Sequence, residues 1–185
     1  AGCALGHAGD AASISTGAAR VDVTPDYPIR LSGFAGRREE ATSVRSRIYA
    51  RALAFGEKEE TCVWLCVDSI GISSAMTKAV AERLRDRAGV NVDRVAISAT
   101  HSHTAPCLSG MINTLFGVEV PAEHQAHIDA YTAELTDKMV EAALAALADR
   151  RPAKWEWGVG SADFALNRRT AGGPVDHSLP VLRIG

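Results

Sequence analysis

Apolar and polar positions along the chain follow two different periods, which predicts a mixture of strands and helices. Short apolar or alternating runs bounded by turn residues are typical of β-strands. Such runs predict strands over residues 18–23, 49–55, 61–68, 91–98, 155–165 and 179–184. The run over 61–68, Thr-Cys-Val-Trp-Leu-Cys-Val-Asp, is almost continuously apolar, which is typical of a strand covered on both faces.

Two segments carry helical spacing instead. Met76, Val80 and Leu84 lie four residues apart, after serines that can cap a helix and before a glycine that can end it, so we expect a helix over 75–88. A longer helix rich in alanine is expected over 122–149. The order strand, helix, strand around 75–88 favours a βαβ unit. The pattern therefore predicts one α/β domain with a mixed β-sheet flanked by helices.

The segments without a clear period divide the chain further. Residues 1–16 are small and polar, which predicts a flexible tail, and the domain itself is expected over 17–185. Residues 25–47 combine proline, glycine and several arginines, which predicts a long loop. A loop of that length inside a compact domain is often functional.

Composition narrows the classes of partner. The chain has 185 residues, of which 46% are hydrophobic, enough for one domain with a sizeable core. Its net charge of -2 gives no indication of a nucleic-acid partner. No apolar run reaches the roughly 20 residues that span a bilayer, so we expect no transmembrane segment. The opening Ala-Gly-Cys resembles the end of a lipoprotein cleavage box, but an arbitrary boundary is the interpretation that we favour, and a secreted, periplasmic, lipid-anchored or cytoplasmic location stays open.

The run Ala-Thr-His-Ser-His-Thr-Ala-Pro over 99–106 carries the most chemical information. It follows the strand predicted over 91–98, and residues two apart on a strand share a face, so we expect His101 and His103 to converge. Imidazole is the commonest metal ligand and carries protons near neutral pH, and α/β proteins build their sites at such strand ends. The pair therefore predicts a metal or catalytic site. The alternative is that one or both histidines are hydrogen-bonded structural residues.

The other nearby candidates to complete a metal site are weak. Catalytic zinc needs about three protein ligands besides water. Cys107, His124, His127 and His177 could supply one, but the two helical histidines are expected on an exposed helix face, His177 in a turn, and Cys107 in a structural role. The sequence alone therefore does not predict a complete site.

Two charged positions also end predicted strands. The Arg168-Arg169 pair either binds a carboxylate or a developing oxyanion, because the guanidinium fork donates two parallel hydrogen bonds, or is a solvated loop pair. Asp68 either orients a ligand histidine or has a structural role such as capping the next helix, and we favour the structural role.

Several motifs resemble, in the same order, those of the neutral/alkaline ceramidases, and the short spacing from Arg168 to Asp176 is similar to that of the compact bacterial members. His101–Pro106 resembles the family motif Thr-His-Thr-His-Ser-Gly-Pro. The other matching segments are 21–25 (Val-Asp-Val-Thr-Pro), 31–37 (Leu-Ser-Gly-Phe-Ala-Gly-Arg), 48–53 (Ile-Tyr-Ala-Arg-Ala-Leu), 166–168 (Leu-Asn-Arg), 175–176 (Val-Asp) and 181–183 (Val-Leu-Arg). The resemblance extends from about residue 17 to residue 185.

The resemblance implies a zinc-dependent amidase that hydrolyses the amide bond of N-acyl sphingosine (ceramide) or a related lipid amide. By position, His101 would be a zinc ligand and His103 would contact the reacting carbonyl or move a proton. Arg168 would hold the substrate or the oxyanion. The implied partner is a lipid or small-molecule amide, attacked by a zinc-activated water.

The resemblance also implies that the site is divided. The family completes its zinc site with a second histidine, a glutamate and a tyrosine, all further along than this chain reaches. Residues 17–185 are therefore expected to be the N-terminal part of a catalytic domain, incomplete at its C-terminus and inactive alone. Two alternatives stay open: a hydrolase of the same fold acting on another amide or ester, and a non-catalytic binding or assembly domain. The oligomeric state is open as well.

Overall fold

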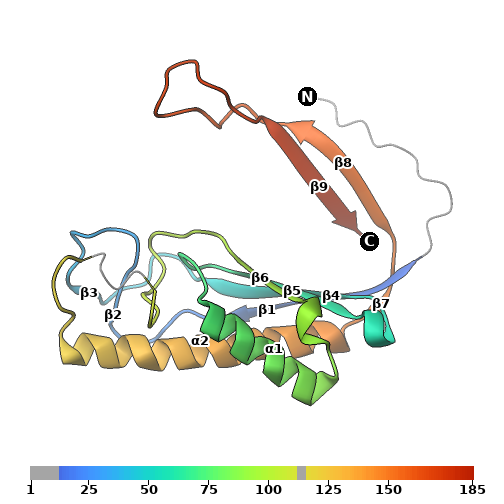
Figure 1. Cartoon of the computed structure of the whole chain (residues 1–185), viewed down its shortest axis with the longest axis horizontal. Helices are drawn as coiled ribbons and strands as arrows, with labels where there is room; N and C mark the ends of the chain where they lie inside the picture. The colour runs from blue at the N-terminus through green and yellow to red at the C-terminus, as the bar shows by residue number, and fades with distance from the viewer. Residues whose placement is uncertain (1–12, 112–115) are drawn as a thin grey trace. The chain divides into compact units, whose positions relative to one another are not determined.

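The computed structural model describes residues 13–111 and 116–185 (Figure 1). Its contacts divide the chain into two compact units, a larger one over Thr16–Arg150 and a smaller one that includes Arg151–Gly185. Most of the predicted flexible tail, residues 1–16, lies outside the described residues, as does the opening Ala-Gly-Cys; the first strand already begins at Ile14.

The described residues form a mixed sheet with two α-helices, as predicted. In chain order the elements are β1 (Ile14–Asp22), β2 (Ile29–Arg30), β3 (Glu40–Ala41), β4 (Tyr49–Phe55), β5 (Cys62–Val67), α1 (Ser74–Ala88), β6 (Val95–Ala99), α2 (Ala122–Ala148), β7 (Arg151–Ala153), β8 (Trp155–Ser161) and β9 (Ser178–Ile184). The main sheet has the order β6-β5-β4-β1-β7. Strands β5 and β6 precede and follow α1 in the sequence and pair in parallel. Strand β4 is antiparallel to both β1 and β5. The predicted βαβ unit is therefore confirmed.

Helices α1 and α2 lie on the same side of this sheet (Figure 1), so β5 is covered on one face. Val63, Leu65 and Val67 are buried, whereas Trp64 on the other face is 48% exposed. Within the larger unit, the prediction that the strand is covered on both faces is wrong. The reason is that Trp64 holds an apolar position at the surface, where its indole Nε1 donates a hydrogen bond to Ser98 Oγ over 3.0 Å.

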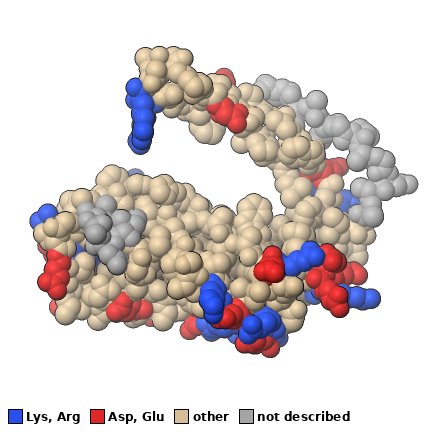
Figure 2. All heavy atoms as spheres, viewed as in Figure 1, with Lys and Arg blue, Asp and Glu red and all other residues tan. Residues whose placement is uncertain are grey.

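Helix α1 forms for the reasons that its sequence predicts. Ser73 Oγ accepts a hydrogen bond from the backbone N–H of Met76 over 3.2 Å, and Gly89 ends the helix with a φ of 69°. The three positions spaced four apart, Met76, Val80 and Leu84, are buried. Figure 2 shows positive and negative side chains side by side over α1, which fits its solvent-facing side, and Arg83 pairs with Asp137 of α2 at 2.7 Å.

Two predicted segments differ in detail. The strand expected over 91–98 is instead a 3-10 turn, Val92–Arg94, followed by β6. Asn91 causes the turn, because its side-chain oxygen accepts a hydrogen bond from the N–H of Asp93 over 3.1 Å. The long loop expected over 25–47 contains the β2–β3 ribbon, in which Ile29 pairs with Ala41.

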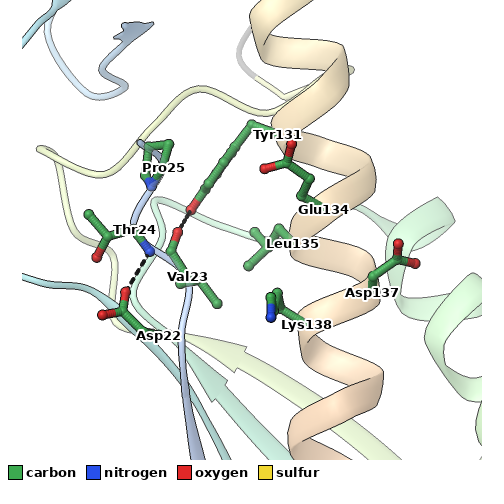
Figure 3. A pocket seen from close by; sticks show the side chains of 9 residues that line it. All are labelled: Asp22, Val23, Thr24, Pro25, Tyr131, Glu134, Leu135, Asp137 and Lys138. Atoms are coloured by element: carbon green, nitrogen blue, oxygen red, sulfur yellow. Dashed lines mark hydrogen bonds between the residues drawn. The ribbon is translucent and has the colours of Figure 1, made fainter. Parts of the chain in front are cut away.

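One buried hydrogen bond attaches α2 to the end of β1, where the chain leaves the sheet for the β2–β3 ribbon. Figure 3 shows Tyr131 reaching from the helix to the carbonyl of Val23, to which its hydroxyl donates over 2.9 Å. Tyr131 is 3% exposed, and this burial raises the pKa of its phenol, so the group stays protonated and remains a donor. The next residue, Thr24, donates its N–H to Asp22 Oδ1 over 2.9 Å.

The smaller unit is mainly an antiparallel hairpin of β8 and β9. Trp157 pairs with Leu182 and Val159 with Pro180, so these side chains share one face of the hairpin. Trp157 is 64% exposed, and Val159 and Leu182 are also exposed. The hairpin therefore presents apolar side chains at its surface. Across the described residues, neither helix has the length and apolar character needed to cross a membrane.

We expect Tyr131→Phe to lower the free energy of unfolding by about 1–2 kcal/mol, because a buried carbonyl loses its donor. Urea unfolding followed by circular dichroism measures this. Tyr27→Phe is the matched control, since the Tyr27 hydroxyl donates at an exposed position to Glu134 over 3.0 Å and should contribute less. Equal losses in the two variants would contradict the role given to the Tyr131 bond.

Candidate functional site

The two histidines of the motif lie in the loop that follows β6. The strand ends at Ala99, and the loop stays attached to the segment after β5 by two backbone hydrogen bonds. Thr100 N donates to Val67 O over 3.0 Å, and Ser102 N donates to Ser69 O over 2.9 Å. The loop is thus held at the carboxyl ends of two parallel strands, where α/β proteins commonly build their sites.

His101 has an uncommon backbone and a fixed ring. Its φ is +58°, in the left-handed region that residues other than glycine rarely adopt. The ring Nδ1 lies 2.8 Å from the carbonyl oxygen of Ile70. A carbonyl can only accept, so Nδ1 carries the hydrogen, and the neutral ring keeps its lone pair on Nε2. This is the tautomer that ligates metal through Nε2.

His103 is held by a second carbonyl in the same way. Its Nδ1 donates to Gly33 O over 3.0 Å, which again leaves the lone pair of the neutral ring on Nε2. The edge of the Phe34 ring packs against the imidazole at a centroid distance of 5.4 Å. Arg37 Nη1 donates to the backbone oxygen of His103 over 3.2 Å.

The two imidazoles are neighbours, as their spacing predicts. Their centroids are 4.8 Å apart and their planes are inclined by 81°. Both residues are exposed, so a ligand can reach them. The predicted cause is wrong, however, because neither residue lies on the strand. The loop conformation, with the left-handed turn at His101, brings the rings together instead.

Gly33 is required at its position by the closeness of His103, and the sequence analysis did not single it out. Its φ is +91°, and a Cβ added there would lie 2.6 Å from both Cβ and Cγ of His103. A real side chain could not fit without moving the histidine. Its position between Ser32 and Phe34 in the long loop gave no signal of this contact.

The segment that carries Gly33 is joined to the second half of the motif. Ser32 donates both its N–H and its hydroxyl to Ala105 O, over 2.8 and 2.9 Å, and Cys107 N donates to Arg30 O over 2.8 Å. Cys107 is buried, and this burial raises the pKa of its thiol to about 11. A neutral thiol packed in the core fits the structural role expected for it.

The helical histidines do not lie on an exposed helix face, so that prediction is wrong. His124 and His127 are partly buried against Glu40 of β3, with His127 Nδ1 2.8 Å and His124 Nε2 3.9 Å from its carboxylate oxygens. A sequence signal existed, because both histidines precede Ile128 on the helix face that continues into the core at Tyr131.

This pair is built to hold the ribbon rather than a metal. Arg30 Nε donates to His124 Nδ1 over 2.9 Å, so the Nδ1 lone pair is already used. Arg30 is 3% exposed, and its guanidinium lies 4.8 Å from the Phe116 ring centroid. Strands β2 and β3 are therefore fastened to α2 by one charged side chain each.

Asp68 has the structural role that we favoured. Its Oδ2 accepts hydrogen bonds from the N–H of Tyr49 over 2.9 Å and from Arg51 over 3.0 Å. These contacts join β4 to the end of β5. The helix that follows is capped by Ser73 instead, and His101 is oriented by a backbone carbonyl.

The remaining candidates lie in the smaller unit. Arg168 is exposed in a turn organised by Asn167, whose Oδ1 accepts hydrogen bonds from the N–H groups of Arg169 and Thr170 over 3.1 and 3.0 Å. His177 Nδ1 donates to Ala162 O over 3.1 Å. The turn holds the backbone next to Arg168 and leaves its guanidinium exposed to solvent.

The side chains at the site are of a type that binds zinc, but there are too few of them for a complete zinc site. Within residues 13–111 and 116–185, no group of three or more histidine, cysteine, aspartate or glutamate side chains is arranged to hold a metal ion. His101 and His103 supply imidazoles whose Nδ1 atoms are hydrogen-bonded to carbonyls, and zinc binds such a ring through its other nitrogen. A complete catalytic zinc site needs about one or two further ligands.

We expect Gly33→Ala to displace His103 and to destabilise the protein by about 1–3 kcal/mol, through the positive φ and the clash. Long-range proton–nitrogen NMR spectra of the histidine rings should show a shifted Nδ1 signal for His103. Gly36→Ala is the matched control, because an added Cβ meets no atom within 4 Å. An unchanged His103 spectrum in Gly33→Ala would refute the contact.

Comparisons with known proteins identify the family of this chain. The sequence matches a family model described as neutral/alkaline non-lysosomal ceramidase, N-terminal, over residues 15–170. The neutral ceramidases of Drosophila pseudoobscura pseudoobscura and Drosophila melanogaster are each 31% identical to it over 99 residues. These alignments cover 51% of this chain and 14% of each fly protein, so the chain spans a small part of their length.

Two solved structures have a similar fold. The crystal structure of neutral ceramidase from Pseudomonas aeruginosa matches with a TM-score of 0.76 and 21% identity, over 95% of this chain and 30% of that one. A structure of ceramidase complexed with C2 matches with a TM-score of 0.75 and 22% identity, over 94% and 29% of the two chains. Because the family model matches most of the sequence, the chain belongs to the neutral/alkaline non-lysosomal ceramidase family.

Proposed function

We propose that residues 17–185 form the N-terminal part of the catalytic domain of a zinc-dependent amidase, which hydrolyses the amide bond of N-acyl sphingosine (ceramide) or a related lipid amide. Family membership supports the reaction class. The observation that carries the proposal is the common orientation of the two histidines, whose Nδ1 atoms both donate to backbone carbonyls. Two accessible imidazoles with their lone pairs on Nε2 are suited to a metal and to proton transfer.

His101 is the proposed zinc ligand, through Nε2. Zinc, when bound, would polarise the amide carbonyl and supply an activated water. The left-handed backbone at His101 supports this role, because strained conformations of this kind concentrate at functional sites. The other ligands would come from outside the described residues.

His103 is the proposed contact to the reacting carbonyl or carrier of a proton. In the hydrolysis, water forms a new C–O bond, the C–N bond breaks, and the leaving nitrogen takes up a proton, which gives a carboxylate and an amine. The Nε2 atom of His103 can accept a proton from the attacking water and return it to the nitrogen, while Gly33 O holds the ring.

Arg168 is the proposed group that holds the substrate or the developing oxyanion. A guanidinium fork can donate two parallel hydrogen bonds to an anionic group such as a carboxylate or a developing oxyanion. Its support is the exposed position in an ordered turn, together with the match of the family model over this segment.

Zinc content tests the metal assignment. In the complete product of the gene that encodes this chain, we expect stoichiometric zinc by elemental analysis and loss of most of it in His101→Ala. His177→Ala is the matched control, since this histidine is bonded to Ala162 O in the smaller unit. Absence of zinc from both the unaltered protein and His101→Ala would overturn the metal assignment.

Kinetics with a fluorescent ceramide test the other two roles. We expect His103→Gln to lower kcat by about 10²–10⁴-fold while zinc is retained. Arg168→Gln should lower kcat/KM by roughly 10²-fold, against little change for Arg169→Gln. If a simpler N-acyl amide or an ester is cleaved and ceramide is not, the substrate class is wrong although the fold and site stand.

A further inference from the structure

A groove of about 500 Å³ lies beside the His103 end of the motif and is not used by the proposed roles. It lies between two stretches of the long loop, 24–31 and 41–48. These stretches are joined at one end by Val23 N, which donates to Ile48 O over 3.0 Å, and further along by the pairing of Ile29 with Ala41. Between these two connections the stretches diverge and leave the groove.

The groove reaches the histidine motif itself. Thr104 and Pro106 line its wall, and Pro106 forms a backbone bridge with Leu31, which lines it as well. Thr104 is the residue next to His103. A molecule lying in the groove would therefore have one end close to the proposed reaction centre.

The walls of the groove are largely apolar. Apolar side chains from both stretches line it, among them Ile29, Leu31, Val44 and Ile48. Val44 is 56% exposed, so its side chain is accessible to a ligand in the groove. A volume of this size falls in the range of roughly 300–1,000 Å³ that is usual for sites that bind small molecules.

Arg37 gives the groove a cationic end next to the motif. Its guanidinium stacks on the Phe34 ring at 4.5 Å and donates one hydrogen bond, from Nη1 to His103 O. A guanidinium has five N–H donors, so others remain to bind a ligand. Arg45 also lines the groove, and Asp26 is the single carboxylate among the lining residues. The lining thus carries more positive than negative charge.

We propose that this groove binds the fatty acyl chain of the amide substrate, and that Arg37 binds the carboxylate that hydrolysis releases on that chain. The inference rests on the proposed function. It goes further by assigning the acyl half of the substrate to this groove. An alkyl chain suits the apolar walls, and a carboxylate suits the oriented fork of Arg37. The other product, a long-chain amine, is a cation near neutral pH and would be disfavoured by Arg37 and Arg45.

Binding of simple amphiphiles to the complete product of the gene that encodes this chain tests this without any need for catalysis. We expect dodecanoate to bind at least tenfold more tightly than dodecylamine or dodecanol by isothermal titration calorimetry, below the concentration at which each forms micelles. The preference should weaken with added salt, because the head-group contact is ionic. Tighter binding of dodecylamine than of dodecanoate would overturn the proposal and would indicate that the groove binds the long-chain base.

Paired variants locate the site. Arg37→Gln should weaken dodecanoate binding roughly tenfold, through loss of a charge-assisted pair, and leave dodecanol binding unchanged. Arg47→Gln is the matched control in the same loop, because Arg47 pairs with Asp22 at 3.1 Å and does not line the groove. Val44→Asp changes an exposed position, so the protein should still fold. This variant should bind both dodecanoate and dodecanol more weakly. Dodecanoate binding that none of these changes alters would overturn the proposal.

The two proposals fail separately. If dodecanoate binds as described but the complete gene product hydrolyses no lipid amide, the groove stands and the proposed function falls. If ceramide is hydrolysed and the Arg37→Gln and Val44→Asp variants bind dodecanoate normally, the proposed function stands and the groove assignment falls.

Discussion

Two backbone carbonyls, those of Ile70 and Gly33, determine the orientation of both imidazoles, and most of the larger unit serves to bring them there. The Ile70 carbonyl belongs to the segment after β5 and reaches His101 because β5 and β6 are parallel neighbours. The Gly33 carbonyl belongs to the segment after β2 and reaches His103 because residues 30–32 pair with 105–107. The site therefore depends on a sheet connection and on a loop connection at once, and losing either releases one ring.

Helix α2 supports the loop connection from below. The hydroxyl of Tyr131 holds the chain where it leaves β1, and the side chains of His124 and His127 hold β2 and β3 through Arg30 and Glu40. A ribbon of two-residue strands has too few backbone hydrogen bonds to be stable alone. The helix thus supports the histidine motif indirectly, by keeping Gly33 against His103.

The sequence predicts those helices and strands that are long enough to show a repeating pattern of apolar positions. Helix α1 with its cap, helix α2 and strand β4 follow the expected bounds closely. The adjacency of His101 and His103 was also predicted, although the loop conformation and not a strand produces it. The β2–β3 ribbon could not be predicted, because strands of two residues show no alternation. The covering of β5 was misjudged because Trp64 is apolar yet lies at the surface. The need for glycine at position 33 depends on a contact 70 residues away, which no local pattern contains.

The left-handed backbone of His101 sets the stability of the fold against the proposed role of this histidine at one position. Glycine would adopt this φ without strain, and asparagine would tolerate it better than most residues, but neither supplies an imidazole. A laboratory evolution experiment that selects for thermal resistance alone would therefore be drawn to replace the histidine, and consensus or stability-based redesign would meet the same pressure. Stabilising substitutions in this protein should therefore be made at other positions, with His101 left unchanged.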